Sequence, residues 1–176
     1  MAREHSDLGS WIRRLREPDP SLSLKEALDA IDADALDSAV GFAAEHCRRY
    51  IATAGEDDGW DGPRPILILY TTGRRSGQTR RNPLLFFDHD GHRYLIASNG
   101  GADADPLWLG NLVDDPRVHV RVMADVHEAT AHVADASTRN VVWPALVEQY
   151  PMFADYQQLT SREIPLIELV PTSEQM

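Results

Sequence analysis

Four arginines, Arg74, Arg75, Arg80 and Arg81, lie within residues 71–82, a segment without an acidic side chain in a protein whose formal net charge is -11. A guanidinium group binds phosphate or carboxylate through a planar fork of donors, and exposed amides in a turn add further donors. Like charges packed this densely repel one another. We therefore interpret the segment as a site for a small anionic ligand, with a solvated, charged turn as the alternative.

Apolar runs flank this arginine-rich segment. Residues 66–70 precede it, residues 84–87 follow it, and glycines at positions 73 and 77 interrupt it. This order is typical of a strand, a glycine-containing turn and a second strand. The two arginine pairs would then stand on facing arms of one hairpin, where we expect the four guanidinium groups to converge.

Aromatic and amide side chains farther along the chain are the next candidates for chemistry. Trp108 and Asn111 lie three positions apart on a predicted helix, where they would stack on a ring and bond its edge, or else serve as a core anchor and a helix cap. Tyr150, Phe153 and Tyr156 follow at three-residue spacing. They form either a packing stripe or a pocket wall, where a tyrosine hydroxyl can donate a proton or orient a carbonyl.

Composition and missing motifs narrow the class of function. An acidic chain argues against general nucleic-acid binding, which needs a broad basic face. The sequence lacks a dinucleotide fingerprint, a P-loop, a nucleophile elbow and a zinc-protease motif, and its seven histidines do not have metal-ligand spacing. Cys47, the single cysteine, excludes an intramolecular disulfide. With no apolar run of the ~20 residues that a membrane span needs and no signal segment, we expect a cytoplasmic protein.

From Pro65 onward the pattern has the period of β-strands. We expect strands at about 66–71, 80–88, 92–98, 118–123, 126–134 and 164–170, and helices after Pro106, over 137–149 and around 153–160. Pro83 cannot donate to a ladder, so its strand should lie at an edge or bulge there. Strands joined mostly by short turns predict a small antiparallel barrel with helices packed outside it.

Residues 1–62 have a different pattern and form a predicted helical N-terminal extension, whereas residues 63–176 form the predicted barrel domain. Apolar residues recur at helical spacing over 8–15, opposite a basic face. Such a helix packs on its own domain or lies on an anionic membrane surface. A second helix, capped by Asp32 or Asp34, is predicted to carry Leu36 on its apolar face and to end at Gly55.

Several separated motifs resemble the deazaflavin (coenzyme F420)-dependent nitroreductase family. The first is Thr-Gly-Arg-Arg-Ser-Gly-Gln-Thr-Arg-Arg-Asn-Pro-Leu at residues 72–84. Further motifs follow in order at 97–102, 106–108, 111–112, 115–116, 143–144, 150–151, 155–156 and 162–165. The resemblance covers roughly residues 64–171, and it is specific because the motifs are separated and keep their order.

The resemblance implies a split β-barrel that binds coenzyme F420, whose phosphodiester and oligoglutamate tail are anionic. The tail would lie on the arginine-rich segment, the ring would lie beside the strands and helix that follow, and Tyr150 and Tyr156 would act on the acceptor. The cofactor-binding residues that the resemblance implies are Arg74, Arg75, Ser76, Arg80, Arg81, Asn82, Pro83, Leu84, Leu85, Ile96, Ala97, Ser98, Asn99, Leu107, Trp108, Leu109, Gly110, Asn111 and Phe153.

Three positions depart from the family pattern. Asn99 stands where a lysine is common, which removes one cationic contact. Phe153 stands where the nitroimidazole-reducing member has a tyrosine, and Leu85 replaces an aromatic residue. These changes affect the choice of substrate more than the binding of the coenzyme.

We expect an oxidoreductase that transfers a hydride from reduced F420 to an electron-poor small molecule such as a quinone, an activated alkene or a nitroaromatic. One alternative is a non-catalytic carrier of the deazaflavin or of another anionic, lipid-like ligand. A second is a flavin mononucleotide (FMN) enzyme of the same barrel type. The sequence leaves monomer and homodimer open.

Overall fold

The structure is a computed structural model that describes residues 35–37, 41–57 and 64–172. Its elements are β1 (Leu36–Asp37), α3 (Gly41–Ala52), β2 (Ile66–Thr72), β3 (Thr79–His89), β4 (His92–Ile96), η1 (Asn99–Gly101), α4 (Leu107–Asp114), β5 (Arg117–Val122), β6 (Asp125–Val133), α5 (Ala136–Gln149), α6 (Met152–Gln158) and β7 (Leu166–Pro171). No helix within these ranges is long and apolar enough to cross a membrane. The predicted helix over 8–15, with its membrane contact, lies outside the described residues.

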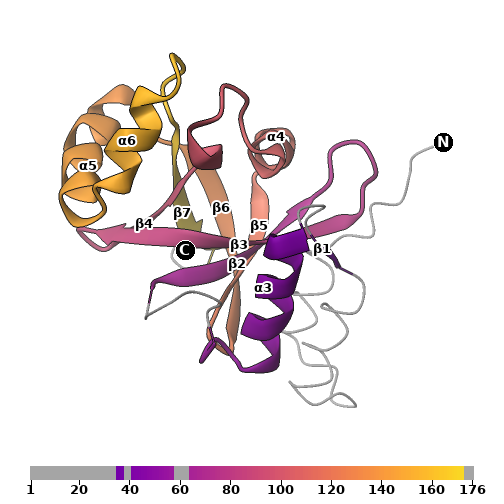
Figure 1. The fold of residues 1–176 in the computed structure, drawn as a ribbon. Helices are drawn as coiled ribbons and strands as arrows, with labels where there is room; N and C mark the ends of the chain where they lie inside the picture. Colours follow the sequence, from indigo (N-terminus) through magenta and orange to yellow (C-terminus); the bar gives the residue numbers. More distant parts are fainter. Residues whose placement is uncertain (1–34, 38–40, 58–63, 173–176) are drawn as a thin grey trace, which may run out of the picture.

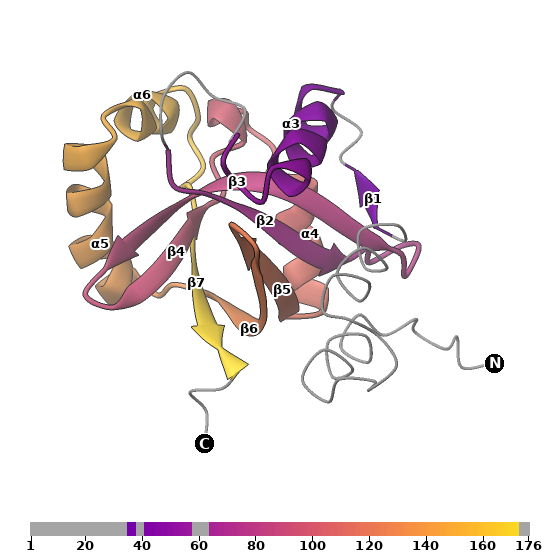
Figure 2. The same ribbon diagram turned by 90° about the horizontal axis from the view of Figure 1, so that it is seen from below.

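Six strands of the described ranges close into an antiparallel barrel. Their order is β3-β2-β5-β6-β7-β4, and β4 pairs again with β3. The two residues of β1 add to β3 in parallel. Figure 1 shows α5 and α6 together on one side of the barrel and α3 across β2 and β3, and Figure 2 shows the same layers from below. The predicted α+β fold, a split β-barrel with peripheral helices, is confirmed.

The alternation of side chains along the strands builds a separate core on each face of the sheet. Leu67 and Leu69 of β2 point into the barrel, where they join Leu95 and Val120. Ile68 and its same-face neighbours in β2 instead pack against α3. The apolar run of β2 is continuous because both of its faces are buried. A third cluster lies beneath α5 and α6.

Tyr50 fixes α3 to the barrel. Its hydroxyl donates to the carbonyl of Ile66 over 2.8 Å and accepts from the amide of Met123 over 2.8 Å. Gly55 ends this region with φ 84°, and its amide donates to the carbonyl of Tyr50 over 2.7 Å. A Cβ at Gly55 would lie 2.7 Å from the Met123 sulfur, so this position requires glycine. Helix α3 itself ends at Ala52, three residues before the predicted end at Gly55, and Gly55 closes the turn that follows the helix.

The predicted start of that helix is wrong. Leu36 was expected on its apolar face, but Leu36 and Asp37 form β1 and pair with Arg80 and Arg81 of β3. Helix α3 begins only at Gly41. A strand partner more than forty residues away decides the conformation of Leu36. The periodicity of neighbouring residues gives no information about such a partner.

Pro83 lies where β3 has an open edge, as predicted. Residues 80–81 of β3 pair with β1 and residues 86–89 pair with β4. Pro83, between these two stretches, is paired with Ile68 of β2 on the other edge. On the open edge no strand is present to accept a hydrogen bond from residue 83. The missing amide hydrogen of proline therefore removes no hydrogen bond from the sheet on that side.

Candidate functional site

The turn between β2 and β3 is closed by its own backbone. The amide of Gly73 donates to the carbonyl of Gln78 over 2.8 Å, and the amide of Gly77 donates to the carbonyl of Gly73 over 2.7 Å. Gly77 has φ 69°, and a Cβ at Gly73 would lie 2.9 Å from the Ser76 hydroxyl. Both glycines are thus required by the shape of the turn. The turn leaves the side chains of Arg74, Arg75 and Ser76 exposed.

Arg74, Arg75 and Arg80 have no ion pair or hydrogen bond through their guanidinium groups within the described part of the chain. Other arginines there pair with a carboxylate, namely Arg48, Arg49, Arg81, Arg93, Arg117, Arg139 and Arg162. In a chain with an excess of acids, unpaired cations are the exception. Arg74, Arg75 and Arg80 are such exceptions among the described residues, and they lie within seven positions of one another.

Helix α4 supports the turn directly. The Arg74 amide donates to Asn111 Oδ1 over 3.1 Å, and Asn111 Nδ2 donates to the Thr71 hydroxyl over 3.1 Å. The Arg74 guanidinium lies over Gly110, where a Cβ would stand 3.0 Å from Cζ. Glycine at 110 therefore allows the guanidinium to approach the helix backbone closely.

Arg81 does not join the other three arginines. It is 8% exposed and forms an ion pair with Asp37 of β1, which also pairs with Arg48 over 3.2 Å. Neighbouring residues of a strand point to opposite faces, so Arg80 and Arg81 diverge. The expectation that four guanidinium groups converge from facing arms is wrong, because two arginines lie in the turn itself and Arg81 points toward β1.

The predicted cofactor residues of β3 also divide between two faces. Leu84 packs against the cluster inside the barrel. Leu85 packs against the clusters under α3 and under α5 and α6. By alternation Asn82 shares the face of Leu84, and Pro83 shares the face of Leu85.

Within α4, the structure favours the packing roles that the sequence left open. Trp108 is 6% exposed and, with Leu109, belongs to the cluster inside the barrel. Asn111 is buried with both ends of its amide bonded within the protein. Leu107, by contrast, is 80% exposed at the start of the helix.

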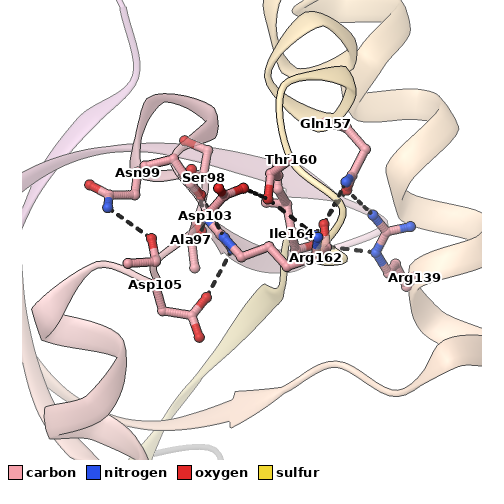
Figure 3. Close-up of polar contacts among 12 residues, drawn as sticks. Ala97, Ser98, Asn99, Asp103, Asp105, Arg139, Gln157, Thr160, Arg162 and Ile164 are labelled. Carbon is pink, nitrogen blue, oxygen red and sulfur yellow. Dashed lines mark hydrogen bonds and ion pairs between the residues drawn. The ribbon is translucent and has the colours of Figure 1, made fainter.

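The segment after β4 turns sharply. Ile96 faces the cluster under α5 and α6, Ala97 faces the barrel interior, and Ser98 begins the turn. Asn99, Gly100 and Gly101 all have positive φ, at 47°, 63° and 82°. The Asn99 amide donates back to the carbonyl of Ala104 over 2.9 Å, so this side chain braces its own loop (Figure 3).

The three aromatic residues near α6 form one stack. Phe153 is 4% exposed and stands edge-on between Tyr150, with ring centroids 6.5 Å apart, and Tyr156, at 5.9 Å. The Tyr150 ring also meets Phe87 of β3 edge-on. The Tyr150 hydroxyl accepts from Gln149 Nε2 over 3.0 Å, and its own proton stays available. Phe153 is thus a core residue that fixes the two tyrosines beside it.

Sequence reasoning missed two residues that organise this region. Asp37 orients Arg81 from a distant part of the chain. Arg162 bonds to the loop after β4 at several points, and only its place in the 162–165 motif marked it in the sequence.

Comparison with known proteins supports one family. A family model described as F420H(2)-dependent quinone reductase matches residues 43–171. The chain is 34% identical over 112 residues to an F420H(2)-dependent quinone reductase of Mycobacterium tuberculosis, covering 61% of this chain and 74% of that protein. A second protein of that organism, which carries the same family name, is 34% identical over 113 residues, 64% of this chain and 95% of the other.

Two solved structures have a similar fold. A structure of an F420-H2 dependent reductase, FDR-A, has a TM-score of 0.55 and 36% sequence identity, covering 60% of this chain and 94% of that one. A structure described as a domain-swapped dimer has a TM-score of 0.57 and 33% identity, covering 71% of this chain and 95% of the other.

Proposed function

Because the chain belongs to the F420H(2)-dependent quinone reductase family, we propose that Arg74, Arg75 and Arg80 bind the anionic phosphate and tail of coenzyme F420. The protein is an F420-dependent oxidoreductase that transfers a hydride to a quinone. The observation that carries the proposal is the presence of three guanidinium groups, unpaired within the described residues, in the β2–β3 turn and at the start of β3.

The donor set fits this coenzyme. A phosphodiester and an oligoglutamate chain present several anionic oxygens, and the exposed Arg74 and Arg75 and the half-buried Arg80 offer them paired donors. In the free protein no described carboxylate competes for these donors. Acids elsewhere in the chain repel an anionic ligand, so attraction is confined to this turn.

The turn is prepared for binding before the coenzyme arrives. The bond from the Arg74 amide to Asn111 and the close contact of its side chain with Gly110 hold it against α4. Fixing a side chain in advance reduces the entropy that binding must otherwise remove. We therefore assign Arg74 the largest share of the affinity among the three.

The ring would lie on the outer face of β3 and β4. Pro83, Leu85 and Ile96 share this face, and the aromatic stack of α6 lies over the same cluster. An apolar floor orients a flat ring and keeps water away from it. Reduced F420, when bound, supplies the hydride.

Tyr150 and Tyr156 are the proposed residues on the acceptor side. A quinone oxygen gains negative charge as the ring is reduced, and a phenol hydroxyl can donate a hydrogen bond or a proton to it. The edge-on contacts with Phe153 fix the direction of each ring. Replacing either tyrosine with phenylalanine keeps the packing and removes only the hydroxyl.

Titration of the purified full-length protein with reduced F420, followed by addition of a soluble quinone, tests the proposal. We expect saturable binding and rapid oxidation of F420 only when quinone is present. Binding without turnover would indicate a carrier, and a yellow protein that retains FMN would indicate the flavin alternative.

A homodimer is the proposed assembly. The similarity to the structure described as a domain-swapped dimer supports it. Light scattering on the eluting protein should give about twice the chain mass of 19.7 kDa. A mass equal to one chain across the concentration range would contradict this assembly.

A further inference from the structure

The Arg162 side chain makes four hydrogen bonds to the segment between β4 and α4 (Figure 3). Its Nε donates to the carbonyl of Ala102 over 2.8 Å, and one terminal nitrogen pairs with Asp105 over 2.8 Å. The other terminal nitrogen donates to the carbonyls of Ala97 over 3.2 Å and Ser98 over 2.8 Å. One side chain thus joins both ends of the loop between β4 and α4.

This loop needs an external support. Three consecutive residues with positive φ give it an irregular backbone, and within it the amides of Gly101 and Ala102 donate to Ser98 and Asn99. Arg162 donates to three carbonyls of this segment, those of Ala97, Ser98 and Ala102, and the Ser98 carbonyl accepts from Gly101 as well. Bonds from a charged donor to carbonyls are stronger than neutral ones.

Arg162 is itself held from the opposite side. Its carbonyl accepts from Gln157 Nε2 over 2.7 Å, and Gln157 Oε1 accepts from Arg139 of α5 over 3.2 Å. Thr160 adds a second link, because its hydroxyl donates to Asp103 over 2.9 Å. The network therefore ties the loop after β4 to α5 and α6 (Figure 3).

The two sides that the network joins have different proposed tasks. The loop follows Ile96, the last residue of β4, begins at Ala97 and Ser98 on the coenzyme side and leads into α4, which supports Arg74. Helix α6 carries Tyr156 on the acceptor side, and a Cβ at Gly101 would stand 2.8 Å from the Tyr156 carbonyl. Arg162 lies at the junction of the two.

We propose that Arg162 is a positioning residue for hydride transfer, which fixes the coenzyme-side loop relative to the tyrosines of the acceptor side. The inference rests on the proposed function. Arg162 acts through the loop and needs no contact with either reactant. A misplacement of about 1 Å can cost ~10²-fold in rate, so a support of this kind controls the rate more than the fold.

The test compares R162A, R162K and a control, R49A. Lysine keeps a charge beside Asp105 but cannot serve three carbonyls with a planar fork. Arg49, on α3, donates two hydrogen bonds to the Asp57 carboxylate, at 3.0 and 2.7 Å. It lies far along the chain from the loop. For each protein we would measure the melting temperature, the Kd for F420, kcat and KM for quinone, and amide exchange over residues 97–105.

We expect R162K to melt close to the parent yet lose between ~10- and ~100-fold in kcat at saturating F420, with faster exchange confined to residues 97–105. R162A should show the same changes and a lower melting temperature, and R49A should match the parent. If R162A and R162K keep the kcat of R49A and lose only thermal stability, the positioning role is contradicted.

Failure of the proposed function is distinguishable from failure of this inference. If the parent does not bind F420, the function fails, and amide exchange then tests only whether Arg162 holds the loop after β4. Faster exchange limited to residues 97–105 in R162K would support it, whereas exchange equal to that of R49A would overturn it.

Discussion

Arginine has opposite environments in the turn between β2 and β3 and at the loop after β4. The Arg162 guanidinium uses four of its five N–H donors in bonds of 2.8–3.2 Å to the protein, so every one of its nitrogens is engaged. Arg74, Arg75 and Arg80 make none through their guanidinium groups within the described ranges. An arginine whose guanidinium is bonded to the protein stabilises the fold. A group of arginines without such bonds in an acidic protein is available for an anionic ligand.

The largest effect should come from removing the positive charges of Arg74 and Arg80. The double variant R74A/R80A should lose about 3–6 kcal/mol of F420 binding free energy, at about 1.5–3 kcal/mol for each charged hydrogen bond, or ~10²–10⁴-fold in Kd. Its melting temperature should change little because neither guanidinium group forms a hydrogen bond or an ion pair with the described residues. Fluorescence titration gives the Kd.

The matched control for that variant is R48A/R49A. It removes the same charge from two arginines that are paired with Glu45, Asp37 and Asp57. An equal loss of affinity in both double variants would mean that the overall field of the protein, and not the turn, attracts the coenzyme.

Substitution of Gly101 should reveal how rigid the loop after β4 is. In G101A the backbone keeps φ 82° and the new Cβ meets the Tyr156 carbonyl at 2.8 Å, so both strain and collision oppose folding. We expect a loss of about 2–4 kcal/mol in the free energy of unfolding. G100A is the control, because φ is 63° but nothing lies within 4 Å of its Cβ, and it should lose only about 1 kcal/mol. Equal losses in urea unfolding would contradict the contact with α6.

Gly110 tests whether the contact of Arg74 with α4 matters for binding. A methyl group there would displace the Arg74 guanidinium, which is flexible and can move away. G110A should therefore weaken F420 binding by about 1.5 kcal/mol. Because alanine favours helix over glycine by up to about 1 kcal/mol, the variant should be as stable as the parent or more so. Unchanged affinity would show that Arg74 binds without this support.

The smallest effect is expected at the start of α5, the helix that contributes Arg139 to the hydrogen-bond network of Arg162. The amide of Thr138 donates to the Asp135 carboxylate at the start of this helix. This bond and the bond from the Ser137 hydroxyl lower the pKa of the Asp135 carboxyl group. A lowered pKa means that this stabilisation is present above the unfolded pKa of about 3.9 and disappears as the pH falls through the folded value.

The variant D135A should therefore melt about 2–4 °C lower at pH 7 and match the parent at the acid end of the transition. A difference in melting temperature that persists unchanged into acid would contradict the role of the ionised cap.

The sequence predicts the strands well because the controlling signals are local. In β5, Val118 and Val120 alternate with polar neighbours, and in the β2–β3 turn the positions of Gly73 and Gly77 mark where the chain reverses. The structure places these elements within a few residues of the predicted bounds. It also confirms the open edge at Pro83, which follows from the missing amide hydrogen alone.

The errors at the site have a common physical cause in contacts between distant residues. Arg81 carries the same charge as Arg80, and only the alternation of β3 and the carboxylate of Asp37, 44 positions earlier, separate them. The hydrogen bonds of the Arg162 guanidinium go to carbonyls about 60 positions earlier in the chain. Residue type predicted an anion site at the turn, but the partners of each arginine decide which of them are free to form it.

A crystal structure of the protein with F420 bound would test directly whether the arginines of this turn bind the coenzyme. We expect phosphate or carboxylate oxygens of the coenzyme within about 3 Å of the guanidinium groups of Arg74 and at least one of Arg75 and Arg80. Coenzyme bound elsewhere, with these three side chains extended into solvent, would contradict it.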